Sequence, residues 1–231
     1  MAKKKLNTQE EVTAPLRIRL FGRLELENQW GRAAEDTSRP SLSWLLLKYL
    51  LVNPDRGVTG EELREAVWPD RGTERAGADR VRLHRLRKAL EPLHLDGQNG
   101  LVLFHTATYQ INPDCDITFD TEELAELLAR LRTVPTDDPA GLELCGQGLE
   151  LFQGPLLACT GPAPWVERLR GAYRERFREL AGTTLERMEA LGDSGLAELL
   201  CRRTAAIAPE DRELCGAVER YLVREKKKSA L

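Results

Sequence analysis

Apolar residues alternate with charged ones in the first segment that shows a regular pattern. The alternation covers Leu16–Phe21 and again Leu24–Glu27, and Gly22 lies between the two runs. A period of two residues is typical of half-buried strands. The two runs therefore predict a β-hairpin.

Helical spacing replaces this alternation from Leu42 onward. Apolar residues then recur every three or four positions, which predicts three successive helices at about 42–50, 60–67 and 76–90. Thr59 and Glu62 have the spacing of a capping box in front of the second helix, in which each side chain satisfies the other residue's amide.

The sequence after the third helix changes pattern twice. Residues 101–104 and 109–111 read as two strands joined by His105-Thr106-Ala107-Thr108, which predicts a second hairpin. Nearly everything beyond Pro113 has helical periodicity. Asp120 paired with Glu123, and Asp138 followed by proline, predict two helix starts there.

The remaining helices are expected at about 165–191, 195–206 and 210–228, after a loop rich in glycine and proline. We therefore predict a mainly α protein with small antiparallel β elements. Its first part has the order of a winged helix-turn-helix, in which the last helix enters the DNA major groove. We place that domain at residues 14–112 and an all-helical domain at residues 115–231.

The third helix carries the most distinctive chemistry of the chain. Leu83, Leu86 and Leu90 share one face, which predicts that this face is buried. The opposite face and its flanks hold Arg80, Val81, His84, Arg85, Arg87 and Lys88. Arginine and lysine bind phosphates and guanine edges, and a small apolar side chain contacts thymine methyl groups. A solvated amphipathic face is the alternative interpretation of the same pattern.

We predict that Val81, His84, Arg85 and Lys88 face the bases of duplex DNA. Arg80 and Arg87 are expected near the DNA backbone or minor groove, together with His105, Thr106 and Thr108 of the hairpin. The amide of Gly60, at the start of the second helix, is expected to hold a phosphate through the helix dipole.

Composition supports a globular protein and argues against several other classes. Hydrophobic residues make up 42% of the chain and charged residues 31%, which excludes disorder as the whole answer. The net charge of −3 hides a split, because residues 1–113 carry about +3 and residues 114–231 about −6. No apolar run approaches the length of a membrane span, so we expect no membrane partner.

The reactive residue types form no recognisable catalytic pattern. The five cysteines include no CxxC pair, and we interpret them as reduced thiols of a cytoplasmic protein. Metal-ligand spacings, a glycine-rich phosphate loop and a nucleophile elbow are all missing from the sequence. We therefore predict no enzyme activity, no cofactor, and neither a catalytic nor a metal site.

Several segments together resemble a known family. They are Leu45–Leu51, Val58–Leu63, Val67–Pro69, Leu83–Leu90, Phe119-Asp120, Leu151–Leu157 and Trp165. With these motifs the sequence resembles the SARP family of bacterial transcriptional activators over about residues 16–225. The resemblance implies an OmpR-like winged helix-turn-helix followed by a bacterial transcriptional activator domain with TPR-like helices.

The spacing of several residues near the end of the chain agrees with such repeats. Gly192, Ala197, Cys201, Thr204 and Pro209 fall at the offsets expected for a tetratricopeptide motif. An ordinary helical bundle is the alternative. Helical repeats of this kind commonly present a groove to a protein partner.

The resemblance also implies the partners. They are double-stranded DNA with repeated promoter sites, a second copy of the chain on that DNA, and RNA polymerase. The expected function is therefore sequence-specific transcriptional regulation, most simply as an activator. A protein-interaction scaffold, in which the winged helix is only a docking module, is the alternative favoured by the modest charge of the first half.

Three features depart from the family pattern. Asp79 stands where an apolar residue is usual, and Thr108 stands where the wing usually has a glycine. The chain also ends about one helix into a further repeat, which predicts a minimal or truncated family member. A receiver, ATPase or phosphopeptide-binding domain is not expected in this sequence.

Overall fold

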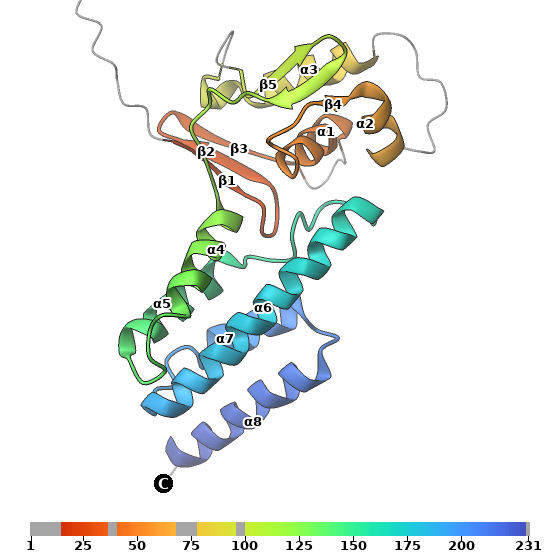
Figure 1. The fold of residues 1–231 in the computed structure, drawn as a ribbon. Helices are drawn as coiled ribbons and strands as arrows, with labels where there is room; N and C mark the ends of the chain where they lie inside the picture. The colour runs from red at the N-terminus through yellow and green to blue at the C-terminus, as the bar shows by residue number, and fades with distance from the viewer. Residues whose placement is uncertain (1–14, 37–40, 68–77, 96–99, 230–231) are drawn as a thin grey trace, which may run out of the picture.

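The computed structural model describes residues 15–36, 41–67, 78–95 and 100–229 (Figure 1). The elements of the first part are β1 (Leu16–Arg19), β2 (Glu25–Asn28), β3 (Gly31–Ala34), α1 (Leu42–Leu51), β4 (Val58–Thr59), α2 (Gly60–Val67), α3 (Ala78–Ala89), the 3-10 helix η1 (Glu91–Leu93), β5 (Val102–His105) and β6 (Thr108–Ile111). The second part contains β7 (Ile117–Phe119), α4 (Asp120–Leu131), α5 (Pro139–Leu151), α6 (Pro164–Leu191), α7 (Ala197–Ile207) and α8 (Arg212–Ser229).

The fold class predicted from the sequence is confirmed. The chain is mainly α with small β elements, and a winged helix-turn-helix precedes a helical region of TPR-like pairs. In Figure 1 the strands and the first three helices lie at the top, and α4–α8 lie below them. Helix α7 packs against α8, and both contact α6, so consecutive helices of this region stack on one another.

A small sheet opens the described chain, with strand order β3-β2-β1-β7. The predicted hairpin is present as β1 and β2, which pair antiparallel, and Ile18 and Leu26 are fully buried partners in it. Strand β3 was not predicted, because the Gly31–Ala34 segment has neither β-branched residues nor a clear alternation.

Strand β7 was also not predicted. It pairs in parallel with β1, and its three residues are too few to show a period of two within a sequence that looks helical. The domain boundary that we propose at Pro113-Asp114 therefore has one strand of the N-terminal sheet on its far side.

The helices of the winged part pack on a second sheet of order β4-β6-β5. Leu46, Leu47 and Leu50 of α1 are completely buried, and α1 contacts α2, α3 and β6. Spacings of one, three and four residues place these leucines on one side of the helix, so α1 is the central core helix of this part.

A buried ion pair joins α1 to the N-terminal sheet. The Lys48 ammonium lies 2.5 Å from the Glu35 carboxylate, and the two side chains are 1% and 5% exposed. Charges this deeply buried are tolerated because each neutralises the other, whereas either one alone would be costly. The pair therefore fixes the sheet relative to the helix-turn-helix.

A buried arginine holds the turn between α4 and α5. Arg187 of α6 is 3% exposed and donates to the carbonyls of Leu131 at 3.1 Å, Val134 at 2.7 Å and Pro135. Its positive charge lies against the carbonyl-rich C-terminal end of α4, where a cation is stabilised. A Cβ at Gly141 would overlap the Arg187 guanidinium, so a larger residue there displaces the arginine from these carbonyls.

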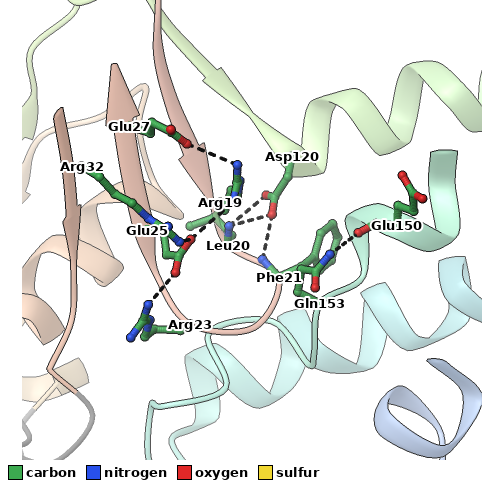
Figure 2. Close-up of polar contacts among 10 residues, drawn as sticks. All are labelled: Arg19, Leu20, Phe21, Arg23, Glu25, Glu27, Arg32, Asp120, Glu150 and Gln153. Carbon is green, nitrogen blue, oxygen red and sulfur yellow. Dashed lines mark hydrogen bonds and ion pairs between the residues drawn. The ribbon is translucent and has the colours of Figure 1, made fainter. Parts of the chain in front are cut away.

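The β1–β2 turn connects the sheet to the helical region. Asp120, at the start of α4, accepts from the Leu20 amide with both carboxylate oxygens, at 2.9 and 2.8 Å, and from the Phe21 amide at 2.9 Å (Figure 2). The Phe21 ring packs on Phe152, with centroids 4.4 Å apart, and Phe152 packs in turn on Phe177 of α6. This turn is thereby anchored in the core of the second part.

Two of the predicted helix caps are different in the structure. The Glu62 amide donates to Thr59 Oγ1 at 3.1 Å as expected, but the Glu62 carboxylate accepts from the Tyr49 hydroxyl at 3.0 Å and from Arg56. Asp120 was predicted to cap α4 together with Glu123. Its carboxylate instead binds the amides of the β1–β2 turn, because that turn reaches the helix start through tertiary packing. The predicted Asp138 cap is confirmed by a 2.9 Å bond from the Ala140 amide.

Some predicted features lie outside the described residues. They are Trp68 and Pro69 of the family motif, the start of the third helix before residue 78, the side chain of Asp79, and residues 230–231 at the end of the chain.

Candidate nucleic-acid interface

Helix α3 is held by the face that the sequence assigned to the core. Leu86 is fully buried, and Leu83 and Leu90 are 7% and 5% exposed. They pack toward α1, and η1 follows α3 directly, with the Leu93 amide donating to the Leu90 carbonyl at 2.9 Å. The buried leucines therefore anchor one face of the helix in the core.

The opposite face of α3 is exposed and positively charged. Its exposed side chains are Arg80, Val81, His84, Arg85, Arg87 and Lys88, as the sequence predicted. Val81 is 50% exposed and lies among these charged side chains. Within the described ranges, none of the basic side chains of this set forms an ion pair or a side-chain hydrogen bond.

Several exposed arginines elsewhere in the described chain are paired, unlike those of α3. Elsewhere arginines pair with carboxylates, as Arg17 does with Glu123 at 2.8 Å and Arg132 with Glu179 at 2.8 Å. Arginines that already have a carboxylate partner have less to gain from a phosphate. The cations of α3 are available to an external anion.

Arg82 is a basic residue of α3 with a different position. It is 7% exposed, so it belongs to the packed side of the helix. Its place beside Leu83 and Leu86 on the helical surface was the signal available in the sequence. We therefore leave Arg82 out of the interface.

The tip of the β5–β6 hairpin forms the wing. Thr106 and Ala107 both have positive φ values, 49° and 62°, which makes the connection a two-residue turn of the type that matches strand twist. His105, Thr106 and Ala107 are exposed. The wing therefore presents short polar side chains to solvent, as the sequence predicted.

Thr108 fits because Gly57, next to the neighbouring strand β4, leaves room for its side chain. Thr108 pairs with Thr59 of β4, and a Cβ at Gly57 would overlap the Thr108 methyl group. The positive φ values fall on the two residues before Thr108, so threonine in place of the usual glycine leaves the hairpin intact. Thr108 is half-buried, and its hydroxyl lies 3.5 Å from the Thr106 carbonyl.

The start of α2 has one feature that favours anion binding and others that oppose it. The Gly60 amide donates to the Ala107 carbonyl at 3.4 Å, so it can hold a phosphate only if it gives up this long bond. Arg56 hydrogen-bonds Glu62 and holds the pKa of that carboxyl below its usual range, so this acid stays ionised beside the helix start. The interaction of Gly60 with DNA stays a prediction.

The predicted residues other than Gly60 lie on two elements of the structure. Arg80, Val81, His84, Arg85, Arg87 and Lys88 lie on α3, and His105, Thr106 and Thr108 lie on the wing. Helix α1 contacts both α3 and β6, so one core helix supports both surfaces. Their contact with DNA is not tested by the fold and stays a prediction.

Other kinds of site were also sought among the described residues. In those ranges no group of three or more His, Cys, Asp or Glu side chains is placed to hold a metal ion. No helix there is long and apolar enough to cross a membrane.

The fold is similar to the solved structure of Mycobacterium tuberculosis EmbR in complex with a low affinity phosphopeptide. The match has a TM-score of 0.50 and 16% sequence identity, and it covers 89% of this chain and 65% of the EmbR chain. The chain thus spans less than two thirds of the length of EmbR. This likeness supports the SARP-like fold predicted from the sequence motifs. No protein-family model matches the chain, and no curated protein matches its sequence.

Proposed function

We propose that the chain is a sequence-specific DNA-binding transcriptional regulator of the SARP type. The observation that carries this proposal is the exposed face of α3, where unpaired cations surround the half-exposed Val81. Phosphates need the cations, and base recognition needs both the guanidinium forks and a small apolar group. The EmbR-like fold supports the assignment at the level of architecture.

In this proposal α3 enters the major groove and the wing lies on the flanking backbone. Arg85, His84, Val81 and Lys88 read bases, while Arg80 and Arg87 bind phosphates. The exposed wing residues approach the neighbouring minor groove or backbone. Anchoring of α3 by its buried leucines keeps the reading face in a fixed orientation, which specific recognition requires.

The test is equilibrium binding to a duplex selected from random sequence, followed by fluorescence anisotropy at several salt concentrations. Replacing Arg85 by alanine is expected to cost about 1 to 3 kcal/mol if it pairs with a guanine, and to relax the preference at one base pair. Arg168→Ala, at an exposed and unpaired arginine of α6, is the matched control and keeps wild-type affinity. Absence of binding at low salt, or unchanged binding in a variant lacking both Arg85 and Lys88, refutes the proposal.

Pairing on DNA is a further part of the proposal. One winged helix covers only a short half-site, so useful specificity needs two copies on neighbouring half-sites. The acidic helical region is the surface available both for this pairing and for RNA polymerase. Sedimentation with a two-site duplex is expected to show two chains per duplex, and one chain at saturation contradicts pairing.

A scaffold without DNA binding is the competing proposal. A helical-repeat scaffold would keep its protein partners when the α3 cations are removed, and it would show no preference among duplex sequences. The same anisotropy series therefore separates the two functions.

A further inference from the structure

A charged cleft of about 690 Å³ lies between the N-terminal sheet and the helical region. It is lined by residues of β1, α4, α5 and α7, so both parts of the chain contribute to it. The cleft is remote in sequence from α3 and contains none of the residues proposed to bind DNA. Its size is within the range of small-molecule sites.

On the β1 side of the cleft, the charged side chains already have partners. Arg17 pairs with Glu123 at 2.8 Å, and Arg19 contacts Glu25 at 3.4 Å. The Asp120 carboxylate is occupied by the two backbone amides of the β1–β2 turn (Figure 2). These groups form a wall that has little remaining capacity for a ligand.

The α7 side is different. Arg202 and Arg203 of α7 line the cleft together with Arg130 of α4, and none of the three has an ion pair within the described part of the chain. Arg203 is half-buried, and its Nε donates to the Leu149 carbonyl at 3.1 Å. That bond fixes the guanidinium, and its two terminal nitrogens have no acceptor among the residues that the structure describes.

Without a bound anion, the positive charges of Arg202 and Arg203 repel each other. Burial, and next the charge of Arg202, lower the pKa of Arg203, while Glu150 acts in the opposite direction. Glu126 and Glu150 are the acids of this side, so three arginines face two glutamates. A ligand with at least two negative charges relieves the repulsion between the adjacent arginines.

We propose that this cleft binds a small multivalent oxyanion, a phosphate- or carboxylate-bearing molecule, through Arg202, Arg203 and Arg130. A pre-positioned guanidinium offers two parallel N–H donors that match either oxyanion, and it loses little freedom on binding. All three arginines belong to the helical region, so α4 and α7 hold the ligand against the wall that β1 contributes. The site does not depend on the proposed DNA-binding function.

Isothermal titration calorimetry of the full chain with inorganic pyrophosphate, and separately with citrate, tests the site. Saturable binding of at least one of them is expected, and the tighter one identifies phosphate or carboxylate as the preferred group. Arg203→Gln and Arg202→Gln are each expected to weaken the Kd about tenfold or more, the usual loss for a charge-assisted hydrogen bond. Arg202 has no hydrogen bond or ion pair with the residues that the structure describes, so its variant reports on binding even if Arg203→Gln does not fold.

Two controls make the result specific. Arg168 is exposed and does not line the cleft, so Arg168→Gln is expected to bind as the wild type does. The Arg85→Ala/Lys88→Ala variant is also expected to keep binding, which separates this cleft from the proposed DNA surface. No saturable binding up to about 10 mM, an equal loss in Arg168→Gln, or a loss in the α3 variant overturns the proposal.

Discussion

Asp120 is the buried carboxylate that joins the N-terminal sheet to the helical region, and its titration predicts an unusual pH dependence of stability. Its side chain is 2% exposed, and burial raises its pKa from 3.8 to about 6, against the opposing effect of the Leu20 and Phe21 amides. The folded protein therefore binds a proton at this site more tightly than the unfolded chain does. Stability from this group is greatest below about pH 4 and falls as the pH rises to about 6.

The magnitude follows from the two pKa values. The difference corresponds to about 3 kcal/mol of folding free energy, lost between about pH 4 and pH 6 and constant above that range. Asp120→Asn has no titrating proton, so the difference in unfolding free energy between wild type and variant should shift by about this amount across the window. Other groups titrate equally in both proteins and cancel in the comparison.

Urea denaturation followed by far-UV circular dichroism at a series of pH values measures the difference. Asp137→Asn, at an exposed aspartate in the α4–α5 turn, is the control and should follow the wild-type pH profile. A difference between wild type and Asp120→Asn that stays constant, or that moves in favour of the wild type as pH rises, refutes the reasoning. That result would mean that the three amide hydrogen bonds outweigh burial.

Two further predictions concern the buried cations. Lys48→Met leaves the Glu35 charge buried and unpaired and should lower the unfolding free energy by about 3 to 5 kcal/mol, whereas Lys48→Met with Glu35→Leu should recover most of it in the same urea experiment. A double variant as unstable as the single one contradicts this. Arg187→Met removes the donor to three carbonyls and should lower the unfolding free energy by about 2 to 4 kcal/mol. Gly141→Ala should also lower the melting temperature, because its methyl group overlaps Arg187. Unchanged melting of Gly141→Ala contradicts that packing.

The exposed and buried faces of α3 could be predicted from sequence because both depend on local spacing. Leu83 and Leu86 are buried and Val81 is exposed, as helical periodicity requires. Arg187 and Lys48 gave no such signal, because their roles depend on carbonyls and a carboxylate brought close only by the tertiary fold. A charged residue on a helix looks the same in sequence whether it faces solvent or a distant partner.

The errors at β7 and at Asp120 share one physical cause. Residues Ile117–Phe119 become a strand because β1 offers a free edge, and Asp120 then lies against the amides at the end of β1. A local cap was predicted since a carboxylate at a helix start usually accepts from its own helix. The long-range pairing, which no local pattern encodes, supplied stronger partners.

The central claim is that the exposed cations of α3 read a DNA sequence. Selection of binding sites from a random pool of duplexes, with the wild type and the Arg85→Ala/Lys88→Ala variant in parallel, tests it most directly. The account predicts that the wild type enriches a short motif repeated at a fixed spacing and that the variant enriches none. Enrichment of no motif by the wild type, or of the same motif by both proteins, would contradict it.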